Sequence, residues 1–121
     1  MVLIIGGMGA GKRSFARSLG YTDQEMTRET GSDLPVFEGL EEVVARSPQT
    51  AGDLLEELCR KELVLCCEVG SGIVPVSASE RMAREETGRL TAALAARAQS
   101  VVRIVAGIPI VLKGELPCGR C

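Results

Sequence analysis

The sequence predicts an α/β fold with a mostly parallel sheet, in a single domain that spans residues 1–121. Short apolar runs rich in β-branched residues alternate with segments of helical periodicity along the chain. The apolar runs do not alternate with polar residues, which is typical of parallel strands covered by helices on both faces. The length suits one domain, and 45% apolar with 25% charged residues is an ordinary globular composition.

The expected strands are the four short apolar runs at residues 2–5, 63–67, 101–106 and 108–112. The last run is interrupted by Pro109, which has no main-chain NH group to donate. Because parallel strands bring their carboxyl ends to one edge of a sheet, the segments that follow the first two runs are expected to face one site.

Between these runs lie four segments with apolar residues at helical spacing, and we expect helices over 12–19, 38–46, 50–61 and 77–98. Thr50 with Asp53, and Ser77 with Glu80, match capping patterns in which side chains satisfy the free NH groups of a helix start. Residues 21–36 are polar and rich in turn formers, so we expect a loop there.

Composition excludes several kinds of site. The chain has no histidine, no tryptophan, one tyrosine and two phenylalanines. Catalytic Ser-His-Asp and Cys-His groups and histidine-bound zinc therefore cannot form from its residues, and aromatic platforms for stacking bases are missing. A net charge of −2 argues against nucleic acid as a partner. No run reaches the ~20 apolar residues of a membrane-spanning helix.

The start of the chain and its five cysteines predict a cytoplasmic location. Residues 1–11 are uncharged, but they are short and rich in glycine, unlike a secretory signal peptide. Without an export signal, an odd number of cysteines is typical of reduced thiols in the cytoplasm.

The glycine-rich segment after the first apolar run fits the phosphate-binding pattern G-x-x-x-x-G-K. It consists of Gly6, Gly7, Met8, Gly9, Ala10, Gly11 and Lys12. Glycines let the main chain wrap closely, so that its NH groups converge on phosphate oxygens at a helix N-terminus, while the lysine contacts the β- and γ-phosphates. The pattern therefore predicts a nucleotide or phosphate site over residues 6–14. The alternative is a glycine turn without a ligand.

One position in this segment departs from the usual pattern. The residue after the lysine is normally Ser or Thr, whose hydroxyl binds Mg²⁺, but here it is Arg13, and Ser14 follows. An arginine has no lone pair to offer a cation. Three alternatives stay open: Ser14 replaces the missing hydroxyl through a shifted turn, Mg²⁺ is held by water and other groups, or catalysis is weakened.

Glu68 follows the second expected strand, at the edge where ligands of parallel sheets bind. In phosphate-loop enzymes a carboxylate in such a place holds Mg²⁺ or its water, or accepts a proton. We predict that Lys12 and Glu68 are catalytic and that Ser14 and Glu68 bind the metal. Gly70 and Gly72 favour this hypothesis, because glycine permits close approach to a ligand. The alternative is an ordinary solvated carboxylate.

Residues 68–75 read E-V-G-S-G-I-V-P and resemble the E-V-G-x-G-I-V-P signature of the adenosylcobinamide kinase / adenosylcobinamide-phosphate guanylyltransferase family. Residues 84–98 resemble the family's R-x-x-x-G-R-x-N-x-x-L-A-x-x-A stretch, with Thr91 in the asparagine position. The loop at 5–12 and the strands at 101–113 also fit. The resemblance covers more than half of the chain.

The resemblance implies a three-layer phosphate-loop NTPase fold of the RecA-like kind. It implies an enzyme of cobalamin biosynthesis that phosphorylates the corrinoid adenosylcobinamide with ATP or GTP and Mg²⁺, and it suggests a homo-oligomer, specifically a trimer. In this mechanism the amides of residues 6–12 and Lys12 hold the phosphates, with Glu68 or Ser14 near the metal.

Family members also transfer GMP through a guanylylated histidine. This chain has no histidine, and it is shortened between the phosphate loop and the second strand, where the histidine usually lies. We therefore expect at most the kinase half of the activity, or GMP transfer by another route. Two other hypotheses stay open: a degenerate module that binds nucleotide or corrinoid without chemistry, and an oligomer-forming subunit whose loop is empty.

Overall fold

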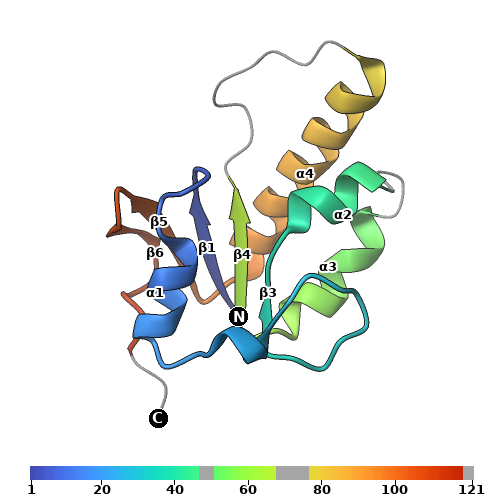
Figure 1. The fold of residues 1–121 in the computed structure, drawn as a ribbon. Helices are drawn as coiled ribbons and strands as arrows, with labels where there is room; N and C mark the ends of the chain where they lie inside the picture. The colour runs from blue at the N-terminus through green and yellow to red at the C-terminus, as the bar shows by residue number, and fades with distance from the viewer. Residues whose placement is uncertain (47–50, 68–76, 119–121) are drawn as a thin grey trace.

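A computed structural model describes residues 1–46, 51–67 and 77–118 of the chain. In these residues the strands are β1 (Val2–Gly6), β2 (Met26–Thr27), β3 (Val36–Phe37), β4 (Leu63–Cys67), β5 (Ser100–Val105) and β6 (Ile108–Lys113). They form one six-stranded sheet in the order β2-β3-β4-β1-β5-β6 (Figure 1). All neighbouring strands are parallel except β5 and β6, which are antiparallel. The prediction of a mostly parallel sheet is confirmed.

The helices of the described residues are α1 (Lys12–Ser18), the 3-10 helix η1 (Asp23–Glu25), α2 (Leu40–Arg46), α3 (Ala51–Cys59) and α4 (Ala78–Arg97). Figure 1 shows α1 on one side of the sheet and α2, α3 and α4 on the other. Each side has its own core of buried residues against the sheet. The three-layer arrangement that the family resemblance implied is therefore confirmed.

None of the helices in the described part of the chain combines the length and the apolar character that a membrane crossing requires.

Alternation along the strands decides which side chains face α1. Val36 on β3 and Leu65 on β4 both pack in the core on the α1 side. Because successive side chains of a strand point to opposite faces, the residues two positions further on point to the same face again. This periodicity directs Glu38 and Cys67 to the α1 side, at the carboxyl ends of β3 and β4.

Two strands of the sheet were not predicted. A continuous loop was expected over residues 21–36, whereas Met26–Thr27 forms β2 and Val36 begins β3. The loop prediction is wrong at these positions, because two residues are too few to show a periodicity. Pairing with the neighbouring strand places them in the sheet. Val36 of β3 lies beside Leu63 of β4 and Phe37 beside Val64, and β2 pairs with β3.

The helix starts follow the sequence signals where the structure describes them. The Ser77 hydroxyl accepts a hydrogen bond from the Glu80 main-chain NH (3.1 Å), which caps α4 as expected. Thr50, the expected cap of α3, lies outside the described residues. Pro109 does not end β6, because an outermost strand uses only half of its main-chain groups in pairing.

Candidate functional site

The loop between β1 and α1 requires glycine where the phosphate-binding pattern has glycine. Gly11 precedes α1 with φ of +101°, in the left-handed region that favours glycine. A Cβ atom on Gly6 would lie 2.8 Å from the main-chain oxygen of Ile104 on β5, which is too close for any side chain. The Gly107 NH group, in the turn between β5 and β6, donates to the Ala10 carbonyl (2.8 Å). The shape of the loop is therefore set by its own sequence and by the hairpin beside it.

The side chain of Lys12 folds back over this loop. Its Nζ atom donates hydrogen bonds to the carbonyl oxygens of Gly6 (3.0 Å) and Gly7 (2.9 Å). It also donates to Sγ of Cys67 (3.4 Å). Gly6 and Cys67 are paired in the register of β1 and β4, so the ammonium group lies at the carboxyl ends of two neighbouring strands. This is the edge at which ligands of parallel sheets bind.

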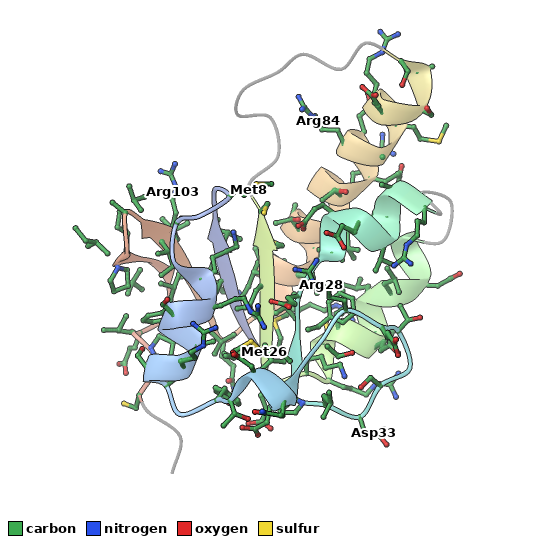
Figure 2. The ribbon with its side chains drawn as sticks, in the orientation of Figure 1. Met8, Met26, Arg28, Asp33, Arg84 and Arg103 are labelled. Carbon is green, nitrogen blue, oxygen red and sulfur yellow. The ribbon has the colours of Figure 1, made fainter. Side chains whose placement is uncertain are left out.

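A cavity of about 530 Å³ opens beside Lys12. Its walls come from the loop, the first turn of α1, the ends of β3 and β4, and the start of α2. Figure 2 labels two of the lining residues, Met8 at the tip of the loop and Arg28 in the segment that leads from β2. The predicted residues 8–14 all line this cavity.

Glu38 is an acidic residue of this cavity. In the sequence, Glu38 and Asp33 flank the loop around Pro35 and could approach a substrate, but neither belongs to the predicted phosphate site. Glu38 follows β3 and is 8% exposed. Its Oε2 atom lies 3.1 Å from Nε of Arg13, and its Oε1 atom lies 3.3 Å from Nε of Arg28. Both carboxylate oxygens are therefore ion-paired. The available signal was the one that led to Glu68, a carboxylate directly after a strand, but here the strand is only two residues long.

The arginines that hold Glu38 are part of a wider network. Arg28 also donates to Oε1 of Glu42 (2.8 Å). This hydrogen bond and the charge of Glu38 raise the pKa of Arg28 above its already high value. Arg17, one turn after Arg13 on α1, pairs with Asp23 (2.9 Å) outside the cavity, and the bond from Arg17 lowers the pKa of the Asp23 carboxyl. The guanidinium group of Arg28 at the cavity wall therefore stays charged at physiological pH.

The two cysteines at the end of β4 have different surroundings. Cys66 faces the core formed with α2, α3 and α4, and its burial raises the pKa of the thiol to about 12. Cys67 faces the loop, and partial burial together with the charge of Glu41 raises the pKa of its thiol. Both thiols are protonated at neutral pH, so neither provides the thiolate that nucleophilic chemistry needs.

The structure brings together Lys12, Arg13 and Ser14 from the predicted site. Ser14 is exposed on the first turn of α1. Glu68 lies outside the described residues, so its role stays a prediction. Within the described ranges, no group of three or more Cys, Asp or Glu residues is placed to hold a metal ion.

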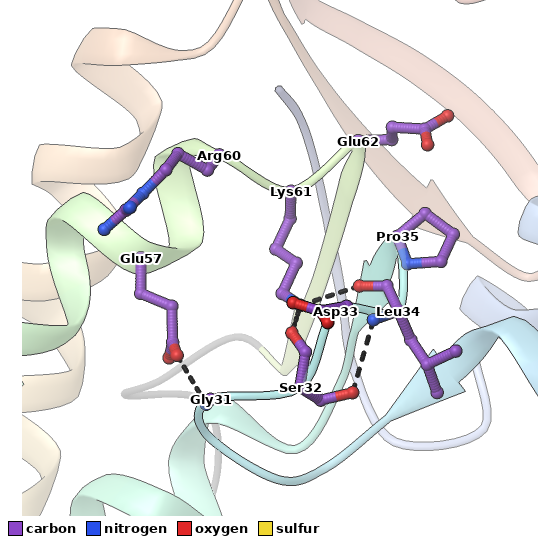
Figure 3. Close-up of a pocket in the computed structure, with 9 residues that line it drawn as sticks. All are labelled: Gly31, Ser32, Asp33, Leu34, Pro35, Glu57, Arg60, Lys61 and Glu62. Atoms are coloured by element: carbon purple, nitrogen blue, oxygen red, sulfur yellow. Dashed lines mark hydrogen bonds between the residues drawn. The ribbon is translucent and has the colours of Figure 1, made fainter.

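A second cavity, of about 440 Å³, lies at the amino ends of the strands, beside the residues that precede β3 and β4 (Figure 3). Lys61 is buried there and donates to the carbonyl oxygens of Ser32 (2.5 Å) and Leu34 (2.7 Å). Glu57 accepts a hydrogen bond from the Gly31 NH group. These groups hold the segment before β3 against the end of α3, and we assign this cavity a structural role.

Comparison with known proteins identifies the family. The family model for cobinamide kinase / cobinamide phosphate guanyltransferase matches residues 26–112, more than half of the chain. The bifunctional adenosylcobalamin biosynthesis protein CobP of Pseudomonas aeruginosa is 38% identical over 63 residues. That alignment covers 52% of this chain and 36% of the relative, so the match spans little more than a third of the relative's length.

The matched range includes Glu38 and lies outside the loop at residues 6–14, whose assignment rests on its geometry. The α/β architecture with a mostly parallel sheet agrees with the phosphate-loop NTPase-like fold expected for this family. The resemblance seen in the sequence motifs is confirmed. The chain therefore belongs to the cobinamide kinase / cobinamide phosphate guanyltransferase family.

Proposed function

We propose that this chain is a kinase of cobalamin biosynthesis that transfers the γ-phosphate of ATP or GTP to a hydroxyl of adenosylcobinamide. The observation that carries the proposal is the position of Lys12, which lies at the carboxyl ends of β1 and β4 beside a cavity of about 530 Å³. The family match supports the corrinoid as the second substrate.

The proposed mechanism relies on positioning and charge. The loop amides and the Lys12 ammonium group bind the β- and γ-phosphates, and the lysine exchanges its bonds to Gly6 and Gly7 for bonds to phosphate oxygens. The transition state of phosphoryl transfer carries its charge on the equatorial oxygens and needs little covalent chemistry from the protein. A lysine, a set of amides and an in-line acceptor hydroxyl provide most of what the reaction requires.

We propose the kinase step without guanylyl transfer through a histidine. None of the 121 residues is histidine, so a GMP–histidine intermediate cannot form on this chain. A second candidate function is a module that binds nucleotide without chemistry. It is favoured by Arg13, which stands at the position of the usual Mg²⁺-binding hydroxyl.

The described residues do not fit a Mg²⁺ ion held by the loop in the usual way. The usual ligands are the hydroxyl after the lysine and an acidic residue at a nearby strand end. Arg13 stands at the first position, and its guanidinium is paired with Glu38, the acidic residue after β3. A Mg²⁺ ion that accompanies the triphosphate is therefore proposed to keep phosphate and water ligands, as this ion commonly does. Metal binding by Ser14 and Glu68 stays a prediction.

Phosphoryl transfer to adenosylcobinamide tests the proposal. The purified chain is incubated with adenosylcobinamide and ATP or GTP, with MgCl₂ present, and the corrinoid products are analysed by mass spectrometry. We expect a product that gains one phosphate and no product that gains GMP. Turnover no greater than that of Lys12→Ala would reject the kinase, and GTP binding without any product would favour the binding module.

The exposed apolar residues of β6 support the proposal of a homo-oligomer, with three copies as the family resemblance suggests. They are Ile108, Ile110, Val111 and Leu112, followed by Leu116. β6 is the last strand of the sheet among the described residues, so one of its edges has no strand beside it there. Soluble proteins usually cover or charge such an edge, and we propose that another copy of the chain covers it.

Replacing Ile110 and Leu112 together by lysine is expected to reduce the assembly to monomers, because both side chains are exposed on β6 and a charged group there would be costly to bury against another copy. Light scattering coupled to gel filtration measures the mass. Glu115→Lys, a charge change at an exposed site just after β6, is the matched control and should keep the oligomer. A monomeric wild type at high micromolar concentration would contradict the proposal.

We also propose a cytoplasmic location. The described cysteines are free thiols: Cys59, Cys66, Cys67 and Cys118. Free thiols are typical of proteins kept in a reducing compartment. Fractionation of cells that produce the chain, followed by immunodetection, tests this location.

A further inference from the structure

Arg13 stands where a phosphate loop normally recruits its metal ion. It follows Lys12 directly on α1 and lines the cavity beside the loop. The Ser or Thr hydroxyl usually found at this position binds the Mg²⁺ that neutralises the β- and γ-phosphates. A guanidinium group carries five N–H donors and no acceptor, so it brings a positive charge of its own and cannot bind a metal.

Glu38, which directly follows β3, is ion-paired with this arginine. In the usual site an acidic residue at a strand end binds Mg²⁺ or its water. Here the carboxylate of Glu38 is 3.1 Å from Nε of Arg13 and 3.3 Å from Nε of Arg28. Its side chain is only 11% exposed, so two guanidinium groups cover a carboxylate that water reaches poorly. The positive charge that balances Glu38 comes from the protein.

The outer nitrogens of Arg13 make one long ion pair and no hydrogen bond within the described residues. Nε faces Glu38, while Nη2 lies 3.8 Å from Oδ1 of Asp23, beyond hydrogen-bond distance. An arginine held through Nε by a carboxylate can offer its Nη groups to two phosphate oxygens at once. Glu38 therefore acts as a positioning residue for Arg13.

The charges around the cavity show why this arginine matters. The described lining residues carry three basic groups, Lys12, Arg13 and Arg28, and three acidic groups, Glu38, Glu41 and Glu42. Without Arg13 the lining would be net negative and would repel a triphosphate. With Arg13 present, the charges of the described lining balance before any metal ion is added.

We propose that Arg13, positioned by Glu38, takes the place of Mg²⁺ beside the bound phosphates, so that this chain binds a nucleoside triphosphate without a divalent metal ion. The proposal rests on the proposed function, because it concerns the same cavity. It concerns binding, and it therefore has a readout that does not depend on turnover.

Calorimetric titration with GTP in EDTA and in MgCl₂ tests the proposal. For the wild type we expect dissociation constants within about threefold of each other in the two buffers. Arg13→Thr restores the hydroxyl and removes the charge, so its affinity is expected to fall roughly tenfold or more in EDTA and to recover in MgCl₂. Arg13→Lys, which keeps the charge, should bind in EDTA with an affinity between those of the wild type and Arg13→Thr.

Arg17→Thr is the matched control. Arg17 lies one turn further along α1 and pairs with Asp23 outside the cavity lining. Its removal should change the affinity by less than about threefold, and equally in both buffers. Thermal unfolding followed by circular dichroism shows that each variant is folded at the titration temperature.

The outcomes separate the inference from the proposed function. Wild-type affinity that falls tenfold or more in EDTA overturns the inference and leaves the phosphate site in place. Arg13→Thr that binds GTP in EDTA as tightly as the wild type also overturns it. If the wild type binds no GTP in either buffer, the phosphate site itself is rejected, and the inference falls with it.

Discussion

Lys12→Ala is expected to weaken GTP binding by about a hundredfold or more, because it removes charge-assisted hydrogen bonds to the β- and γ-phosphates. The side chain is already at the carboxyl ends of β1 and β4, so its contribution requires no rearrangement of the loop. Phosphoryl transfer to adenosylcobinamide should fall at least as far. Calorimetry measures the binding, and single-turnover kinetics measures the transfer.

Two controls distinguish loss of the charge from loss of the fold. Lys113→Ala removes a lysine that bonds to the carbonyl oxygens of Ala95 and Ala96 at the end of α4, away from the cavity, and should leave GTP affinity unchanged. Lys12→Arg keeps the charge and should recover part of the affinity. A Lys12→Ala variant that binds GTP like the wild type would refute the assignment of this loop as the phosphate site.

Phe37→Ala is expected to lower the free energy of unfolding by about 3–5 kcal/mol, because it leaves a large cavity in the core. Phe37 is fully buried on β3 and packs in the core shared with α2, α3 and α4. Urea unfolding followed by circular dichroism measures the change. Because Phe37 directly precedes Glu38, the variant should also bind GTP more weakly at temperatures where it is still folded.

Two further substitutions, one conservative and one at an exposed position, provide reference values for this change in the free energy of unfolding. Phe37→Leu keeps an apolar side chain in the space and should cost less than about 1.5 kcal/mol. Met8→Ala, at a side chain that is 95% exposed on the loop, should change the stability by less than about 0.5 kcal/mol. A Phe37→Ala variant as stable as Met8→Ala would mean that β3 does not contribute to the core.

The parts of the fold that the sequence predicted are those with a local signal. The runs at 2–5, 63–67 and 101–106 became β1, β4 and β5, which are five or six residues long, and their apolar character indicates burial on both faces. β2 and β3 are two residues each, and they exist because β4, more than twenty residues further along the chain, provides pairing partners for β3. No local periodicity can report a contact of that kind.

The same limit applies to the site. The pattern of residues 6–12 predicted the loop, because Gly6, Gly11 and Lys12, which define the pattern, each have a local conformational or chemical reason. The identity of Arg13 showed only that a hydroxyl was absent, and three alternatives followed from that. Its pairing with Glu38 depends on the position of β3 beside β4, so the partner became visible only in three dimensions.

The ammonium group of Lys12 is hydrogen-bonded to the carbonyl groups of Gly6 and Gly7, within its own loop. An anion that binds Lys12 must displace these two carbonyl groups. Its measured affinity is therefore the difference between the bonds it forms and the bonds it replaces. A small anion that contacts only the ammonium group gains little free energy from this replacement. A chain of phosphates can bind the ammonium group and the main-chain amides together. The loop is therefore expected to bind longer anions more tightly than shorter ones, even without contacts to a base or a sugar.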